Sequence, residues 1–361
     1  MDVRCTATTT RGDFDAKSMR RVLSLLIVVI VLAAGWLLLW RGLDWDMDQP
    51  SSAAVPVRVD VPVGAGLRPV LQQLQRQGAV RHARMVALYL RLHGLSVRVQ
   101  AGTYEIVPHE TARDVLEQLN SGRVVLESLT VVEGWTFAQL RHALDAHPAI
   151  AHQLRDLTDS QIMSALGHDG EAAEGRFFPD TYRFAAGTAD RKILEGAYER
   201  MQIELNNAWM ARAANLQLSS AQQALIMASI VEKETGREDE RARVAAVFEN
   251  RLRIGMRLQT DPTVIYGLGE RYDGTIHTRD LETDTPYNTY TRAGLPPTPI
   301  ALPGAASLQA TMHPADTDAL YFVATGNGDG SHQFSATLAQ HDVAVRAYLR
   351  KIGVQPANGH R

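Results

Sequence analysis

The sequence is poor in the residues and motifs on which several protein classes depend. Its 361 residues include one cysteine, Cys5, which excludes an internal disulfide framework and a zinc ribbon. Its formal net charge of −3 leaves no basic excess, so we do not expect it to bind nucleic acid. The twelve histidines show no metal-ligand spacing, and neither His-Glu-x-x-His nor Gly-x-Ser-x-Gly occurs. We therefore predict no metal site, no cofactor and an ordinary hydrophobic core.

A single long apolar run stands out from this composition. Residues 22–40 read VLSLLIVVIVLAAGWLLLW. About 19 residues, each rising about 1.5 Å, span roughly 28 Å, which matches the hydrocarbon core of a bilayer. Basic residues precede the run and aspartates follow it, so the positive-inside rule predicts a cytoplasmic N-terminus and an exported body. These residues are Arg4, Arg11, Lys17, Arg20 and Arg21 before the run, and Asp44, Asp46 and Asp48 after it.

This pattern predicts a cytoplasmic tail over 1–21, a single transmembrane helix over 22–40 and a linker over 41–54. A cleaved signal peptide is the alternative, with residues 32–34 (LAA) as its cleavage site. The apolar run continues through Leu39, beyond the point where cleavage would fall, and this favours the membrane anchor.

A small α+β segment is predicted next, over residues 55–132. Its predicted elements are a strand over 55–61, helices over 67–78 and 85–90, a strand over 102–106, a helix opened by Thr111 and Asp114, and a strand over 124–132. The last strand, helix and strand resemble a LysM-like glycan-binding module. A plain α+β spacer is the alternative.

Residues 133–355 are predicted to form a larger domain of mixed α/β character. From Thr136, which with Gln139 predicts a capped helix, the chain has a helical pattern for roughly eighty residues, broken at 175–184. After Leu258 the pattern changes to short strands and loops rich in proline and glycine, and it ends in a helix. The fold class is therefore α+β, with a membrane anchor, a small module and a larger domain.

The segment SAQQALIMASIVEKETG, at 220–236, carries the candidate chemistry. Ser220 and Gln223 predict a capping box at the start of a helix, and Gly236 can end it in a left-handed conformation. The apolar middle of the segment predicts a largely buried helix. Its last turn holds two carboxylates, Glu232 and Glu234.

Carboxylates are unfavourable at a helix C-terminus, because that end carries partial negative charge. The same field, together with burial, raises a carboxyl pKa and keeps the group protonated near neutrality. A protonated carboxyl is what a general acid needs to cleave a glycosidic bond. Two positions on a helix differ by about 200°, so Glu232 and Glu234 face different ways and only one is the candidate acid. An ordinary charged helix end is the alternative.

Several long strings resemble the endolytic murein transglycosylases, the YceG-like family. They are AGTYEI at 101–106, EGRFFPDTY at 174–182, ASIVEKET at 228–235, ENRLRIGMRLQTDPTVIYGLGERY at 249–272, PYNTY at 286–290, GLPPTPIALPG at 294–304 and HPADTDALYFVA at 313–324. The strings occur in the family's order and at matching spacing. This many long matches make the resemblance specific.

This resemblance implies a bitopic inner-membrane protein with a LysM-like subdomain and a periplasmic catalytic domain that faces the cell wall. It implies a lysozyme-like catalytic helix on which Glu234, the glutamate followed by threonine, is the acid, with Glu232 as the fallback. The implied reaction cleaves the bond between MurNAc and GlcNAc within nascent glycan strands and leaves 1,6-anhydroMurNAc ends. Such cleavage would terminate glycan elongation, in partnership with peptidoglycan synthases.

Three further residues lie in loops that match the family's motifs. We predict that Asp261, Asn288 and Tyr290 line the glycan groove or orient the acid, with ordinary loop structure as the alternative. A muramidase would use the same acid with a second carboxylate, for which Asp180 and Asp261 are the candidates. A membrane-tethered scaffold that binds peptidoglycan without cleaving it is the non-enzymatic alternative.

Overall fold

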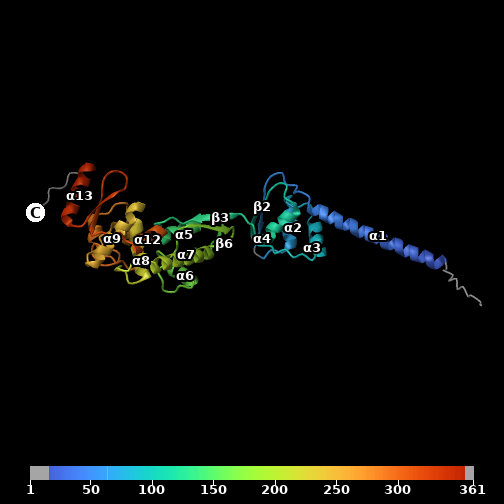
Figure 1. Ribbon diagram of the computed structural model, residues 1–361, viewed down its shortest axis with the longest axis horizontal. Coiled ribbons are helices and arrows are strands. Elements are labelled where there is room, and N and C mark those ends of the chain that lie inside the picture. The colour runs from blue at the N-terminus through green and yellow to red at the C-terminus, as the bar shows by residue number, and fades with distance from the viewer. Residues whose placement is uncertain (1–15, 63, 354–361) are drawn as a thin grey trace, which may run out of the picture. The chain divides into compact units, whose positions relative to one another are not determined.

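The structure, a computed structural model, describes residues 16–62 and 64–353, with side chains from Met19 onward (Figure 1). Cys5 therefore lies outside the described residues. The chain divides into two compact units, Met1–Val125 and Leu126–Arg361. Each sheet among the described residues has two strands, so helices dominate a mixed α+β fold.

The apolar run forms one long helix, α1 (Ala16–Met47). Its part Met19–Met47 is long and apolar enough to cross a membrane, and its side chains are exposed as far as Leu39. These features fit a single-pass membrane anchor. The helix continues through 41–47, where the sequence predicts a linker, because Leu43 and Met47 are buried in the core of the first unit.

A two-stranded antiparallel sheet and three short helices complete the first unit. These elements are β1 (Val57–Val61), α2 (Leu67–Arg76), α3 (Ala83–Leu92), β2 (Gly102–Ile106) and α4 (Ala112–Ser121). The register places Val59 opposite Tyr104, and both side chains are fully buried. The predicted capping box of α4 is confirmed, since Thr111 and Asp114 each bond the other's backbone N–H.

One arginine fastens the end of α1 to this unit. Arg113, on α4, donates to Asp48 Oδ1 (2.6 Å) and to Asp44 Oδ1 (3.0 Å). It also donates to the Tyr89 hydroxyl of α3 (2.7 Å). The hydrogen bond to Asp48 is the main cause of a raised Arg113 pKa. The first unit and the end of α1 thus form one packed body.

The second unit begins with a strand that the sequence groups with the first module. This strand, β3 (Leu126–Thr130), pairs antiparallel with β5 (Thr181–Ala185). The pairing follows from burial, because Leu129 and Phe184 both pack in a hydrophobic cluster of the second unit. The small α+β module therefore ends before β3.

The other elements of the second unit are mostly helices. Before the candidate segment come α5 (Phe137–Ala146), β4 (Ile150–Ala151), α6 (Asp159–Ala165), β6 (Thr188–Ala189) and α7 (Asp190–Met210). After it come α9 (Glu238–Arg253), α10 (Asp261–Leu268), the 3-10 helix η1 (Gly269–Arg271), α11 (Thr278–Glu282) and α12 (Ala305–Met312). The predicted capping box of Thr136 and Gln139 at the start of α5 is confirmed.

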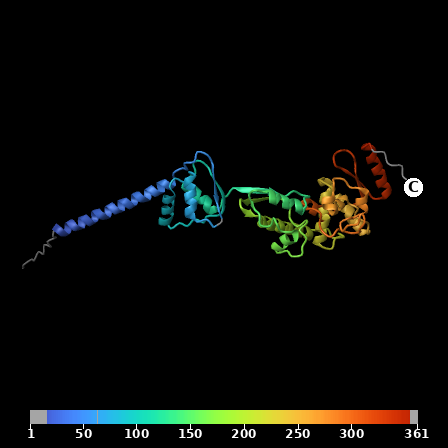
Figure 2. The ribbon, with the colours of Figure 1, turned by 180° about the vertical axis from the view of Figure 1, so that it is seen from behind.

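The last third of the chain differs from the short strands predicted after Leu258. Short helices fill much of it, and the described strands there are the hairpin β7 (Tyr321–Ala324) and β8 (His332–Ser335). The local apolar runs are too short to distinguish a buried helix from a strand by periodicity. The hairpin lies beside α13 (Leu338–Lys351) at one end of the second unit (Figures 1 and 2).

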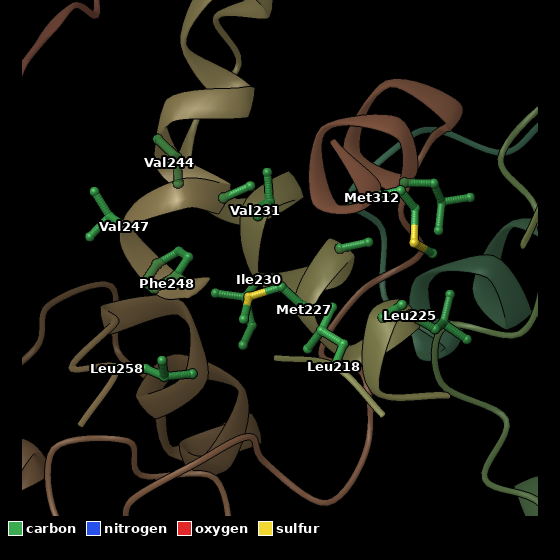
Figure 3. Close-up of a cluster of buried hydrophobic side chains, with 14 of the residues drawn as sticks. Leu218, Leu225, Met227, Ile230, Val231, Val244, Val247, Phe248, Leu258 and Met312 are labelled. Carbon is green, nitrogen blue, oxygen red and sulfur yellow. The ribbon is translucent and has the colours of Figure 1, made fainter. Parts of the chain in front are cut away.

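The candidate segment forms α8 (Ala221–Glu234), in the middle of the largest hydrophobic cluster. Every residue from Ala224 to Val231 is buried. Figure 3 shows Ile230 and Val231 of α8 close to Val244 and Phe248 of α9. Burial on all sides fixes α8 in place, so the carboxylates of its last turn are held by a rigid support.

Candidate active site

The ends of α8 differ in detail from the sequence prediction. Ser220 Oγ accepts the N–H of Gln223 (3.2 Å), but the Gln223 side chain accepts the N–H of Ser219 (2.8 Å) and leaves the predicted box half formed. The helix ends at Thr235, whose backbone is extended (φ −145°, ψ 131°). Gly236 is not among the residues with positive φ. After this extended residue only Gly236 and Arg237 separate α8 from α9.

Glu234 is the last residue of α8 and is partly buried. Its Oε1 accepts a hydrogen bond from the Thr260 hydroxyl. Burial is the main cause of a raised Glu234 pKa, and the negative charge of Asp261 raises it further, whereas the Thr260 bond opposes the shift. The carboxyl therefore stays protonated to a higher pH than an exposed glutamate does.

The Glu234 side chain borders a cleft with a volume of about 410 Å³. Aromatic residues from α9, β7 and the loop after α11 line it: Phe248, Tyr321, Phe322 and Tyr290. Charged and polar residues, among them Arg251, Gln259 and His341, complete the lining, so the cleft combines aromatic surfaces with hydrogen-bonding groups.

Asp261 and Tyr290, two of the predicted site residues, meet Glu234 in this cleft. The Tyr290 hydroxyl donates to Asp261 Oδ1 (2.6 Å), and burial together with this bond raises the Tyr290 pKa. Asp261 is exposed and is the first residue of α10, the helix end that carries partial positive charge. The structure therefore places one shielded carboxyl beside one exposed carboxyl.

Asn288, the third predicted site residue, lies outside the cleft. Its side chain is 1% exposed, and its Nδ2 donates to the carbonyls of Asp280 (3.1 Å), Leu281 (2.9 Å) and Thr283 (2.7 Å). Its Oδ1 accepts the N–H of Tyr290 (2.8 Å). These four bonds leave the amide nothing to offer a substrate, so Asn288 shapes the loop that presents Tyr290.

We expect Asn288→Ala to lower the free energy of unfolding by about 2–3 kcal/mol, because it leaves buried carbonyls without a donor. Chemical denaturation of the wild type and the variant measures this loss. The matched control is Asn207→Ala, on the exposed face of α7, which should change stability little. If the variant kept its stability but had a raised KM for glycan, Asn288 would be a substrate-binding residue, as the sequence predicts.

Sequence reasoning missed a threonine pair that positions the Glu234 carboxyl. Thr289, which is 2% exposed, accepts the N–H of Thr260 through Oγ1 (3.0 Å), and its carbonyl accepts the N–H of Gln259 (3.2 Å). Gln259 has a φ of 49°, a conformation that non-glycine residues rarely adopt. This bend directs the Thr260 hydroxyl to Glu234. No periodicity or charge pattern marks Thr260 or Thr289 as special.

Arg251 is a third residue that sequence reasoning missed. It lines the cleft although its side chain is largely buried, and burial lowers its pKa. Its Nε donates to the carbonyl of Leu320 (2.7 Å) and its Nη1 to that of Leu258 (2.5 Å). Arg251 therefore braces two walls of the cleft and places a positive charge near Glu234.

The other candidate carboxylates point elsewhere. Glu232 Oε2 accepts the N–H of Gly304 (2.9 Å), at the start of α12, so the two glutamates of α8 diverge as predicted. Asp180 is exposed, accepts the N–H of Thr181 (2.6 Å) and does not line the cleft. Among the described residues that line the cleft, Asp261 is thus the carboxylate that accompanies Glu234.

Glu174, in the string EGRFFPDTY, is a buried carboxyl outside the cleft. Its Oε1 accepts the N–H of Phe137 at the start of α5 (3.0 Å), and its Oε2 accepts the hydroxyl of Tyr266 on α10 (3.1 Å). Burial raises the Glu174 pKa to about 7. Glu174 therefore joins the start of α5 to α10, the helix that begins with Asp261.

We expect Glu174→Gln to remove a pH dependence of stability. The raised pKa of Glu174 stabilises the fold fully below about pH 4.5, and this contribution is lost as the pH rises through about 7. The variant should therefore gain about 2–3 kcal/mol relative to the wild type between pH 4.5 and 8. Urea denaturation at both pH values checks this, with the exposed Glu199→Gln as control. If the unfolding free energies of the variant and the wild type differed by the same amount at both pH values, the raised pKa of Glu174 would be contradicted.

These features define a class of protein: an α+β protein with one N-terminal apolar helix and, in its second unit, a cleft bordered by a carboxyl with the raised pKa that a general acid needs. The site has one shielded carboxyl with a raised pKa at the wall of an open cleft. Within residues 16–62 and 64–353, no group of three or more His, Cys, Asp or Glu side chains is placed to hold a metal. The side chains present can transfer protons to and from a bound substrate.

Comparison with known proteins gives the particular family. The YceG-like family model matches residues 59–347, and the chain belongs to this family. It is 30% identical over 312 residues to the endolytic murein transglycosylase of Bacillus subtilis, covering 81% of this chain and 85% of the relative. It is 25% identical over 365 residues to the protein of that name from Streptococcus pneumoniae strain D39, covering 91% of this chain and 65% of the relative. A crystal structure of a YceG-like protein from Listeria monocytogenes is similar with a TM-score of 0.50 and 28% identity, covering 80% of this chain and 98% of that one.

Proposed function

We propose that this protein is an endolytic lytic transglycosylase of peptidoglycan. The observation that carries the proposal is Glu234, a carboxyl with a raised pKa that borders an open cleft. A general acid that acts near neutrality needs a pKa above that of an ordinary glutamate. The relatives named endolytic murein transglycosylase support the same activity.

In the proposed reaction, Glu234 acts first as acid and then as base. It protonates the oxygen that links MurNAc to GlcNAc, and the bond from that oxygen to C1 of MurNAc breaks. The resulting carboxylate takes the proton of the MurNAc C6 hydroxyl as that oxygen bonds to C1. The products are a 1,6-anhydroMurNAc end and a GlcNAc 4-hydroxyl, with no water consumed. The Thr260 bond orients Glu234 for both steps.

The proposal gives Asp261 and Tyr290 distinct roles beside the acid. The charge of Asp261 adds to the effect of burial in raising the Glu234 pKa, and it stabilises the positive charge that develops at C1. Tyr290 holds Asp261 in place through its hydroxyl. The aromatic faces of Tyr321 and Phe322 are suited to pack on the apolar faces of sugar rings.

We expect Asp261→Asn to shift the pH profile of cleavage. The wild-type rate should fall as the pH rises through the Glu234 pKa, because the acid is lost. Without the Asp261 charge, that pKa is lower and the descending limb moves to lower pH. The pH dependence of kcat/KM, with Asp180→Asn as control, measures the shift. An unmoved limb would show that Asp261 does not act on the acid.

The finer fold assignments belong to this proposal. We propose that α8, a buried helix with the acid in its last turn, serves as the lysozyme-like catalytic helix. We propose that the small α+β part of the first unit is the LysM-like module and binds glycan; of the predicted strand, helix and strand it keeps β2 and α4, because β3 belongs to the second unit. Its own hydrophobic core and its antiparallel pair β1–β2 support a separate binding module.

We propose that α1 anchors the protein in the cell inner membrane, with its N-terminus cytoplasmic and both units periplasmic. Lys17, Arg20 and Arg21 precede the apolar run, which supports this orientation by the positive-inside rule. Cleavage near the membrane would act on nascent strands and terminate their elongation, which makes peptidoglycan synthases the proposed partners.

The test is the chemistry of the cut ends. Peptidoglycan digested with the full chain in detergent should release fragments with anhydro ends, identified by mass spectrometry. Reducing ends would instead support a muramidase, for which Asp261 is the second carboxylate in the cleft. Binding without cleavage, in a sample that retains its folded signature, would support a peptidoglycan-binding scaffold.

A further inference from the structure

The first unit carries a strong positive charge that the proposed reaction does not use. Residues 61–104 contain six arginines and no aspartate, glutamate or lysine, in a chain of net charge −3. These arginines are Arg68, Arg76, Arg81, Arg84, Arg91 and Arg98. All six are exposed, and none forms an ion pair with a carboxylate of the described residues. The segment therefore offers several uncompensated guanidinium groups.

Three of these arginines line a groove between α2 and α3. Arg68, Arg84 and Arg91 border it together with Gln72 and Leu88, and its volume is about 360 Å³. Arginine side chains bind phosphate oxygens through paired N–H donors. Leu88 adds an apolar contact beside them, and its side chain is 36% exposed. The groove thus combines donors for a phosphate with a contact for an acyl chain.

One side of the groove is α3, which packs against the end of α1. The ring of His93, directly after α3, is 4.3 Å from that of Trp40, the last residue of the apolar run. Met85 of α3 borders a second pocket with Leu39 and Trp45 of α1. Tryptophan is enriched where a membrane helix meets the headgroups. Helix α3 is therefore held where α1 leaves the bilayer.

The aspartates that follow the apolar run do not cancel this charge. Asp44 and Asp48 bind Arg113 on α4, and Asp46 Oδ1 binds His82 Nδ1 at 2.6 Å. Their carboxylates are therefore occupied within the unit. The groove arginines are left to interact with groups outside the protein.

We propose that the α2–α3 groove binds the headgroup of an anionic phospholipid in the leaflet that α1 reaches. The proposal rests on the membrane anchor proposed above. Basic residues near an anionic leaflet are attracted to it, and the effect adds over several arginines. A headgroup bound in this groove would hold the first unit against the membrane and limit how far the chain can tilt on α1.

The test counts the lipids that the full chain retains. The chain is purified from detergent mixed with equal amounts of phosphatidylglycerol and phosphatidylcholine, and bound lipid is measured by native mass spectrometry. We expect at least a fivefold preference for phosphatidylglycerol, which falls close to parity in the triple variant Arg68→Gln, Arg84→Gln, Arg91→Gln. The corresponding lysine variant should keep most of the preference. It shows that the loss follows charge and not misfolding.

The control variant removes the same charge from the second unit: Arg183→Gln, Arg271→Gln and Arg279→Gln. Equal retention of both lipids by the wild type would overturn the proposal, and so would the same loss of preference in the control variant. A preference that murein glycan fragments abolish at equimolar concentration would assign the groove to glycan and overturn it as well. If the proposed membrane anchor were wrong, the chain would retain neither lipid, and this result differs from each of the results above.

Discussion

Glu234→Gln is expected to reduce glycan cleavage about 10³-fold or more while leaving the fold intact. Glutamine can still accept the Thr260 hydrogen bond, but it can neither give a proton to the glycosidic oxygen nor take one from the C6 hydroxyl. The loss should appear in kcat, with binding of glycan fragments retained. Release of soluble muropeptides over time, at matched enzyme concentration, measures it.

The matched control is Glu232→Gln, which changes the other glutamate of the same helix turn. Because Glu232 binds the Gly304 N–H at the start of α12, this variant should lose some stability and keep its activity within a few-fold. Glu234→Gln should instead stabilise the fold above neutral pH, since it removes a buried carboxyl whose ionised form is unfavourable there. Activity lost in the Glu232 variant but retained in the Glu234 variant would contradict the assignment of the acid.

The second large effect concerns where the first unit begins. A soluble fragment that starts at Ser51 lacks Leu43 and Met47, which are 3% and 1% exposed in the unit's core. It also lacks the aspartates that bind Arg113. We expect the first unit of this fragment to be about 3–5 kcal/mol less stable than in a fragment that starts at Arg41.

Urea denaturation of the two fragments measures the difference in the free energy of unfolding. Hydrogen exchange of the backbone amides of α4 shows whether the loss of stability lies in the first unit. In the Arg41 fragment, the double variant Leu43→Ala, Met47→Ala should reproduce most of the loss. Equal stability of the two fragments would mean that the end of α1 does not stabilise the first unit. Residues 41–54 would then be a linker, as the sequence predicts.

The sequence predicts elements whose signals are local. The apolar run of α1, the caps Thr111 and Thr136 and the buried middle of α8 each follow from a few neighbouring residues. The sequence pattern instead groups β3 with the first module, because its pairing with β5 joins residues 51 to 59 positions apart. No local pattern encodes such a pairing.

In the candidate site, too, the sequence predicts what depends on neighbouring residues and misses what depends on tertiary contacts. The raised pKa of Glu234 agrees with the burial that the apolar helix predicts, and its divergence from Glu232 follows from helix geometry. The role of Asn288 does not, because an asparagine in a turn has the same sequence pattern whether it binds a ligand or three loop carbonyls. Thr260 and Arg251 reach the cleft only through tertiary contacts, so no spacing identifies them.

The central claim is that Glu234 cleaves glycan without water, and digestion in H₂¹⁸O tests it most directly. The proposed mechanism predicts that the new ends contain no ¹⁸O and have the mass of the anhydro sugar, because the C6 oxygen of the substrate attacks C1. Fragments that gain one ¹⁸O at C1 when the wild-type chain cuts, and none with Glu234→Gln, would contradict it and establish hydrolysis by the same acid.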